Sequence, residues 1–282
     1  MSKGEVQKNI HLHSLVSHLP TPNWLGTIFQ VVVSKHTFPI VFQNPRSLQT
    51  MVDAALMELA FGHSSSDDAD NGEGHVEQTG PSEIGDKEHC HSFSTVFRTI
   101  RSTIVPGLIQ VQSCVEESLQ DHLLDSMSEL GWLDNPKSNQ ALCFGAMPAW
   151  LDPAVACIPP DAMPPEFAQR EPRFDHMLVN IYEPGEGLNQ HVDLLRFEDG
   201  IISISLSSAC VMVFTHIRSR AEVPILLEPG DVLCMHGPAR YEWTHGIPAR
   251  LSDEWEGRTL ERERRVSITL RRMRPDGWTL QD

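Results

Sequence analysis

Two side chains that commonly bind metal ions stand two residues apart in the segment NQHVDLLRFEDG, residues 189–200. His191 and Asp193 follow the turn-rich run YEPGEG. In an extended backbone, residues i and i+2 point to the same side, so both can reach one ion. Two histidines and one carboxylate bind Fe(II) on one octahedral face and leave the other positions open. His-x-Asp alone is a chance loop feature in most chains, so this interpretation requires a third ligand downstream.

Two histidines further along the chain could supply that ligand. His236 directly follows the apolar run VLCM. His245 ends RYEWTH, which we interpret as a second, aromatic-rich strand before a Gly-Ile-Pro turn. The third ligand should lie on a later strand on the opposite side of the pocket, which favours His245 over His236.

A pair of arginines in RRVSITLRR could bind an anionic co-substrate. Arg265 and Arg271 are six residues apart, so on a strand they lie on one face. Arginine suits bidentate carboxylate binding, although an Arg-rich strand is more often a solvated edge. Asn180 and Tyr182 are also i and i+2 and could donate hydrogen bonds into the same pocket. The strand would share its arginine face with Ser267 and Thr269 and turn its other face to the core with Val266, Ile268 and Leu270.

The elements that must position these residues are short strands. From residue 177 on, MLVNIYEP, GIISISLSSACVMVF, VPILLEPGDVLCM and RRVSITLRRM alternate with period two between Pro and Gly turns, which predicts a sandwich or barrel-like β core. Residues 133–175 are Pro-rich and are expected to be irregular. Before them, a strand-like opening leads into a helix that ends at Gly131. One apolar stripe follows this helix through Val115, Leu119, Leu123, Met127 and Leu130.

The first 92 residues differ in composition from the rest. Residues 1–63 form an extension of uncertain role, in which residues 44–62 predict one short amphipathic helix. Residues 64–92 are acidic and rich in Gly and Ser, so burial cannot offset their ordering entropy and we expect a disordered linker. The His89-Cys90-His91 run in this linker is interpreted as exposed loop rather than a zinc site, and His11, His13 and His18 as surface residues.

Composition excludes several classes of protein. The chain has 282 residues, 40% of them hydrophobic, and a formal net charge of −16, which argues against non-specific coating of nucleic acid. Arginines concentrated in residues 258–274 still leave room for a local basic rim. The start MSKGEVQKNI lacks an apolar h-region, so we expect no secretory signal, and we find no apolar run long enough to span a membrane. Six scattered cysteines without Cys-x-x-Cys predict reduced thiols.

Four elements in order resemble the AlkB family of Fe(II)/2-oxoglutarate dioxygenases. They are the Asn-x-Tyr strand and the His-x-Asp pair in NIYEPGEGLNQHVD, the distal His before Gly-Ile in GDVLCMHGPARYEWTHGI, and the Arg-x5-Arg strand in RRVSITLRR. The resemblance covers residues 104–275. It implies an α+β, mainly β fold with a double-stranded β-helix (jelly-roll) core, flanking N-terminal helices, and a dioxygenase domain over residues 93–282.

The same resemblance implies the roles of the site residues. His191, Asp193 and His245 would bind Fe(II). Arg265 would hold the distal carboxylate of 2-oxoglutarate, and Arg271, expected to be catalytic with the three ligands, would lie beside the metal-proximal end. Asn180 and Tyr182 would assist Arg265 in binding 2-oxoglutarate.

The activity implied is hydroxylation, or oxidative demethylation, of an alkylated or modified base in DNA or tRNA. 2-Oxoglutarate and O₂ would be consumed, and a hydroxylated N-methyl group would leave as formaldehyde. The chain resembles most the eukaryotic branch that includes the tRNA wobble-uridine hydroxylase. It departs from the bacterial repair enzyme after the metal-binding Asp, where Leu194-Leu195-Arg196 replaces acidic residues.

Two other functions remain open on the same core: a protein hydroxylase or demethylase, and a non-catalytic scaffold that binds 2-oxoglutarate. We expect a monomer without membrane association in the cytoplasm or nucleus. Phe144 and Trp150 fall where such proteins have a lid, and could either stack on a base or pack the lid. Tyr241 and Trp243 are expected to pack the β core.

Overall fold

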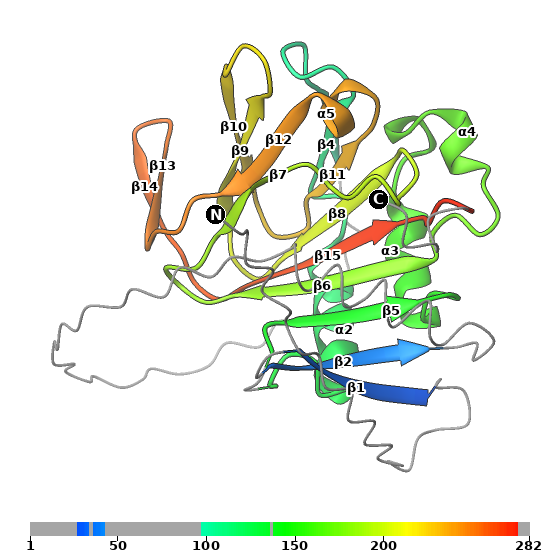
Figure 1. Cartoon of the computed structure of the whole chain (residues 1–282). Coiled ribbons are helices and arrows are strands. Elements are labelled where there is room, and N and C mark those ends of the chain that lie inside the picture. Colours follow the sequence, from blue (N-terminus) through cyan, green and yellow to red (C-terminus); the bar gives the residue numbers. More distant parts are fainter. Residues whose placement is uncertain (1–26, 34–35, 43–96, 136–137, 276–282) are drawn as a thin grey trace, which may run out of the picture.

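The computed structural model describes residues 27–33, 36–42, 97–135 and 138–275. Within them the chain forms a sandwich of a larger and a smaller sheet, with helices over the outer face of the larger one (Figure 1). In these parts of the chain, no helix is both long and apolar enough to cross a membrane.

The larger sheet contains nine strands in the order β1-β2-β5-β6-β15-β8-β11-β4-β3. All neighbours are antiparallel except β2 and β5, which are parallel. The strands are β1 (Thr27–Val33), β2 (His36–Phe42), β5 (Gln140–Phe144), β6 (His176–Tyr182), β15 (Arg265–Arg271), β8 (Ile201–Leu206), β11 (Val232–Met235), β4 (Leu108–Gln112) and β3 (Arg98–Arg101).

The smaller sheet contains four strands in the order β10-β9-β12-β7, all antiparallel. They are β10 (Glu222–Leu227), β9 (Cys210–His216), β12 (Trp243–Ile247) and β7 (Leu188–His191). The chain alternates between the sheets along β6-β7-β8-β9 and again along β10-β11-β12-β15, which is the winding of a jelly roll. The predicted mainly β fold with a jelly-roll core is therefore confirmed. A separate hairpin, β13 (Ser252–Trp255) and β14 (Arg258–Glu261), extends from one end of the smaller sheet (Figure 1).

Helices cover the outer face of the larger sheet. The predicted helix is observed as α2, Glu117–Glu129. It buries Leu123 and Met127 fully, and Gly131 ends it with a positive φ of 68°, a conformation that glycine adopts without steric penalty. The shorter helical segments are η2 (Ala149–Leu151), α3 (Asp152–Cys157), η3 (Pro160–Ala162) and α4 (Pro165–Ala168), whereas α5 (Pro238–Tyr241) contacts β12 of the smaller sheet.

Strand alternation sorts the larger sheet into an apolar outer face and a partly polar inner face. On β15, Val266, Ile268 and Leu270 pack into the core beneath the helices, as predicted from their spacing. The inner face packs on the smaller sheet through a second core that includes Leu233, Met235 and Phe214. The polar residues of β15 therefore point between the two sheets.

Two predicted elements differ in the structure. RYEWTH is not one strand: Arg240 and Tyr241 belong to the short helix α5, which starts at Pro238 after Gly237, and β12 begins only at Trp243. Proline fixes φ near a helical value and is favoured in a first helical turn, so the segment that begins at Pro238 forms a short helix instead of a strand. Tyr241 is consequently 40% exposed, whereas Trp243 packs in the core as expected.

The second difference is β5, which lies inside the stretch expected to be irregular. After Gln140 its residues are apolar on both faces, so QALCF shows none of the polar–apolar alternation that reveals the equally buried β8 and β15. Next to β5, at the same edge of the sheet, the described part of the N-terminal extension forms the hairpin β1-β2. The helix predicted for residues 44–62, the linker at 64–92 and the histidine-rich runs lie outside the described residues.

Candidate active site

Three side chains that can bind a metal ion lie together in a pocket between the smaller sheet and β15. His191 on β7 and His245 on β12 are direct cross-strand partners, with ring centroids 4.4 Å apart. Asp193 follows β7 by two residues, and its Oδ2 is 3.5 Å from Nε2 of His245. One ligand atom from each of the three residues lies within 4.8 Å of the other two. The structure thus brings together the three residues that the sequence singled out, in a donor set suited to Fe(II).

The charge states of this cluster favour a cation. Burial alone would raise the pKa of the Asp193 carboxyl, but Arg271 and the neighbouring histidines outweigh it and hold that pKa below its usual range. Arg271 Nη2 lies 2.5 Å from Asp193 Oδ1. Burial, with His191 nearby, lowers the pKa of His245 to about 3. Near neutral pH the cluster therefore offers an ionised carboxylate and a neutral imidazole, the forms that bind metal.

The orientation of His191 is fixed by a backbone group. Its Nδ1 lies 2.8 Å from the carbonyl oxygen of Asn189. That contact fixes Nδ1 as the protonated nitrogen, because a carbonyl only accepts, and leaves Nε2 to bind a metal.

A second buried arginine lines the same pocket. Arg265 is 3% exposed and donates from Nη2 to Ser205 Oγ at 3.1 Å. Its Nε and Nη1 are buried and have no hydrogen-bond partner among the residues that the structure describes. Leaving charged N–H groups buried without acceptors is strongly unfavourable, so this arginine fits an anionic ligand such as a carboxylate.

Asn180 and Tyr182 line the pocket beside this arginine, as their spacing predicted. Gln140 Nε2 donates to Asn180 Oδ1 at 2.6 Å, which leaves the amide nitrogen of Asn180 as a donor. Burial raises the pKa of Tyr182, so its hydroxyl stays protonated and can also donate. The guanidinium of Arg265 lies 5.3 Å from the centre of the Tyr182 ring. These groups form a cradle of donors complementary to a carboxylate.

The whole polar face of β15 lines the pocket, since Ser267 and Thr269 lie there with both arginines. Apolar walls come from both sheets, with Leu178, Leu188, Met212, Leu233 and Met235. A pocket with a metal-binding cluster at one end and an unsatisfied arginine at the other matches a small dicarboxylate that reaches from metal to cation.

A family model described as the 2OG-Fe(II) oxygenase superfamily matches residues 114–271, more than half of the 282 residues. The chain belongs to this superfamily. As a 2OG-Fe(II) oxygenase it uses Fe(II), 2-oxoglutarate and O₂, and the His-Asp-His cluster is of the type that binds the iron. It is a dioxygenase.

Similar curated proteins place this oxygenase among the AlkB-like members. ALKBH8 of Macaca fascicularis, a tRNA (carboxymethyluridine(34)-5-O)-methyltransferase, is 48% identical over 80 residues, which make up 28% of this chain and 12% of that protein. The alkylated DNA repair protein ALKBH8 homolog of Arabidopsis thaliana is 27% identical over 207 residues, 60% and 59% of the two chains. The tRNA demethylase abh1 of Schizosaccharomyces pombe is 30% identical over 113 residues, 35% and 36%. The oxygenase spans less than two thirds of each relative's length.

Several other predicted residues lie away from the oxygenase pocket. His236 follows β11 and contacts the edge of the Phe167 ring, with centroids 6.2 Å apart, and it is not among the residues lining the pocket. Phe144 packs on the buried His176 at 4.7 Å, and Trp150 on Trp132 at 6.1 Å. Both aromatic side chains are buried, so the packing interpretation holds and base stacking by them is not supported.

One residue with a direct contact to the cluster was missed from the sequence. Arg240 on α5 is 2% exposed and donates to the carbonyl oxygens of Asp193 at 2.8 Å and Leu194 at 2.7 Å. It thus fixes the backbone that carries the carboxylate ligand. Its partners are backbone atoms, which leave no mark in a sequence.

Proposed function

We propose that this oxygenase hydroxylates, or oxidatively demethylates, an alkylated or modified base in nucleic acid. Iron would be bound by His191, Asp193 and His245. The bound iron, with O₂ and 2-oxoglutarate, supplies the oxidising chemistry, and the protein determines which C–H bond is placed beside it.

The co-substrate would be oriented by the donors deeper in the pocket. Arg265 would receive the distal carboxylate of 2-oxoglutarate, because its Nε and Nη1 are buried donors without a hydrogen-bond partner in the described part of the chain. Asn180 and Tyr182 add neutral donors on β6. Arg271 holds Asp193 ionised and in place at the other end, so that one carboxylate oxygen stays directed at the metal position.

The names of similar proteins support a nucleic-acid substrate, and the net charge of the chain restricts how such a substrate could be bound. The similar proteins of Macaca and fission yeast are named for acting on tRNA, and that of Arabidopsis for DNA repair. The chain carries 38 acidic and 22 basic residues, so a nucleic acid would be engaged at a restricted surface around the pocket rather than by overall charge.

The decisive test is mass spectrometry of nucleosides from total tRNA and from methylated DNA. Each would be incubated with Fe(II), 2-oxoglutarate and wild-type protein, His191→Ala or His122→Ala, the last an exposed histidine on α2. We expect a methylated nucleoside to decrease, or a hydroxylated one to form, with wild type and His122→Ala only. Succinate production without any change in nucleosides would refute the base specificity and indicate a protein or small-molecule substrate.

A further inference from the structure

The pairing of the two histidine-bearing strands contains an irregularity. His245 pairs with His191 and Ile247 pairs with Leu188, so β7 uses three residue steps where β12 uses two. β7 therefore has one extra residue, a β-bulge between the two pairs. Gly246 accommodates the bulge, since a Cβ at this position would lie 2.7 Å from the carbonyl oxygen of Leu188.

The bulge makes the register of β7 critical for iron binding. Side chains alternate along a strand, so a slip by one residue would turn His191 away from His245. β7 has only four residues, and Asn189 and Gln190 are exposed. An apolar pattern this short specifies register weakly, so the register must be held by other contacts.

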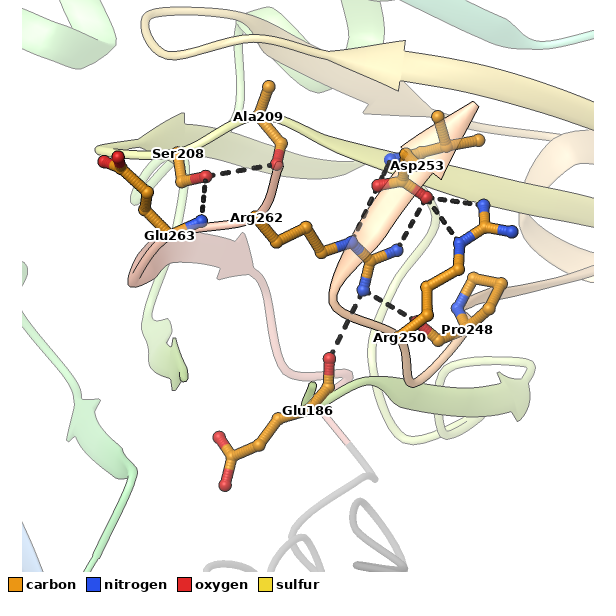
Figure 2. Close-up of polar contacts among 9 residues, drawn as sticks. Glu186, Ser208, Ala209, Pro248, Arg250, Asp253, Arg262 and Glu263 are labelled. Atoms are coloured by element: carbon orange, nitrogen blue, oxygen red, sulfur yellow. Dashed lines mark hydrogen bonds and ion pairs between the residues drawn. The ribbon is translucent and has the colours of Figure 1, made fainter. Parts of the chain in front are cut away.

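A buried arginine joins the two strands just beyond the bulge (Figure 2). Arg262 lies between β14 and β15 and is 8% exposed. Its Nη1 donates to the carbonyl oxygen of Pro248 at 2.7 Å and to that of Glu186 at 3.4 Å. Pro248 directly follows β12, and Glu186 precedes β7 by two residues. One guanidinium nitrogen thus connects the chain leaving one histidine strand to the chain entering the other.

A buried carboxylate fixes that guanidinium. Asp253 on β13 accepts hydrogen bonds from Arg262 Nε at 2.7 Å and Nη2 at 2.9 Å. The same carboxylate accepts from the backbone N–H of Val211 on β9 at 2.9 Å. The pair therefore ties the ends of β7, β12 and β9 together at one end of the smaller sheet.

We infer that Arg262 is a positioning residue for iron binding: with Asp253 it holds the register of β7 against β12 and so keeps His191 opposite His245. This inference rests on the proposed function of His191 and His245 as metal ligands. Arg262 itself lies at the opposite end of β7 from Asp193 and does not line the pocket.

The chain offers a matched control in Arg250. It donates from Nε to the same Asp253 Oδ1 at 2.7 Å, but its side chain is 41% exposed. Its described hydrogen bonds go to that carboxylate and not to the carbonyl oxygens flanking β7 or β12. Loss of Arg250 removes a charge from the network without releasing the strands.

The test is titration of the purified full chain with Co²⁺, followed by the d–d absorption of the bound ion, with thermal unfolding of the metal-free protein alongside. We expect Arg262→Lys to weaken Co²⁺ binding about 10-fold, the lower end of the range for groups that orient metal ligands. Lysine keeps the charge but cannot bridge two carbonyls and a carboxylate at once. Asp253→Asn should weaken Co²⁺ binding less than Arg262→Lys does. The Co²⁺ affinity of Arg250→Gln should stay within about two-fold of wild type.

The outcomes separate a positioning role from a merely structural one. If Arg262→Lys lowers the melting temperature but binds Co²⁺ with wild-type affinity and spectrum, the inference is wrong. If Arg262→Lys does not fold, the Co²⁺ affinity of Asp253→Asn is compared with that of Arg250→Gln instead, and equal affinities would show that the inference is wrong. Wild-type protein that bound no Co²⁺ would overturn the proposed function and the inference with it, whereas unaltered variants of a metal-binding wild type would overturn the inference alone.

Discussion

At the scale of single residues, the site combines ligands with groups that set their charge and direction. Arg271 stabilises the ionised form of Asp193, and the carbonyl oxygen of Asn189 orients His191. Arg265 instead holds a buried Nε and Nη1 that have no hydrogen-bond partner within residues 97–135 and 138–275 or the described hairpin β1-β2. The chemistry of each residue therefore predicts a different kinetic effect on substitution.

Arg265→Ala should raise the KM for 2-oxoglutarate by about 10-fold or more while changing kcat little. A hydrogen-bonded charge–charge contact contributes roughly 1.5–3 kcal/mol, and the distal carboxylate does not react. The adjacent Arg264→Ala is the matched control, since Arg264 is 43% exposed and pairs with Glu183 outside the pocket. Steady-state succinate formation at varied 2-oxoglutarate measures both constants. Equal KM values for the two variants would contradict the role of Arg265.

The third ligand can be tested against its sequence competitor. His245→Ala should abolish detectable Mn²⁺ binding, because it removes one of three ligands. His236→Ala should retain binding, since His236 packs on Phe167 rather than in the pocket. Isothermal titration of both purified variants with Mn²⁺ distinguishes them, and loss of binding in His236→Ala alone would reverse the assignment.

The sequence predicted the pocket residues well because their signals are local. Arg265 and Arg271 are linked by even spacing, which β15 converts into a shared face, and Asp193 follows the strand of His191 by only two residues. Arg240 and Arg262 were missed because they donate to backbone carbonyl oxygens, which a sequence does not mark, at separations of 14 to 76 positions along the chain. Arg262 was instead counted among the arginines of residues 258–274 that could form a local basic rim, although it is buried.

At the scale of elements, alternation predicted β6, β8 and β15 but not β5 or α5. β5 has apolar residues on both faces and so shows no period, and α5 interrupts an aromatic run that alternates by coincidence. The bulge between β7 and β12 was equally unpredictable, because it depends on Gly246 passing close to another strand. Periodicity specifies which face a residue occupies, whereas bulges and Pro-led turns depend on tertiary contacts.

Arg240→Met should loosen the segment after β7 that carries Asp193. It leaves two carbonyl oxygens without the donors they have in the wild type, and we expect a loss of about 2–3 kcal/mol in the free energy of unfolding. Co²⁺ affinity should fall as well, because the carboxylate ligand is then held by its side-chain contacts alone. Urea unfolding and Co²⁺ titration measure the two effects. Tyr241→Ala, on the exposed side of α5, is the control and should preserve metal affinity.

The hydrogen bonds that Asp253 on β13 accepts from Arg262 and Val211 should make the free energy of unfolding depend on pH. Burial alone would raise the pKa of Asp253, but hydrogen bonds from Arg262, Val211 and Arg250 lower it. A carboxyl with a lower pKa in the folded state stabilises the fold above its unfolded pKa, about 3.9, and loses this contribution as pH falls through the folded value.

Wild type should therefore exceed Asp253→Asn in stability by a constant amount from about pH 8 to pH 5, and the difference should shrink below about pH 4. Urea unfolding of both proteins across this range provides the measurement. Asp125→Asn, on the exposed face of α2, should differ little from wild type throughout. A wild-type advantage that stayed constant down to pH 3 would show that the Asp253 charge does not contribute.

At the scale of the whole molecule, the two sheets meet around the pocket, so ligand binding and folding are coupled. The cluster draws on β7, β12 and the segment after β7, and the co-substrate cradle on β6 and β15. These elements come from both sheets and assemble only in the folded chain. A ligand that binds the folded state alone stabilises it by mass action.

Mn²⁺ with 2-oxoglutarate, each at 100 times its dissociation constant, should therefore raise the melting temperature. Each ligand at that excess contributes about 2.7 kcal/mol, and 1 kcal/mol corresponds to roughly 2–4 °C for a domain of this size, so one ligand alone should add roughly 5–10 °C. A chelator should reverse the part that depends on Mn²⁺. Scanning calorimetry of the full chain with each ligand added singly and together gives the measurement.

Variants at the two ends of the pocket show which residues are needed for each ligand to raise the melting temperature. Asp193→Ala should lose the response to Mn²⁺, and Arg265→Ala should keep it but respond less to 2-oxoglutarate, because the two residues contact opposite ends of the pocket. His122→Ala, far from both, should respond as wild type does. If Asp193→Ala kept the full Mn²⁺ response, the ion would be stabilising the fold from another position, and the coupling between the two sheets would not pass through the His-Asp-His cluster.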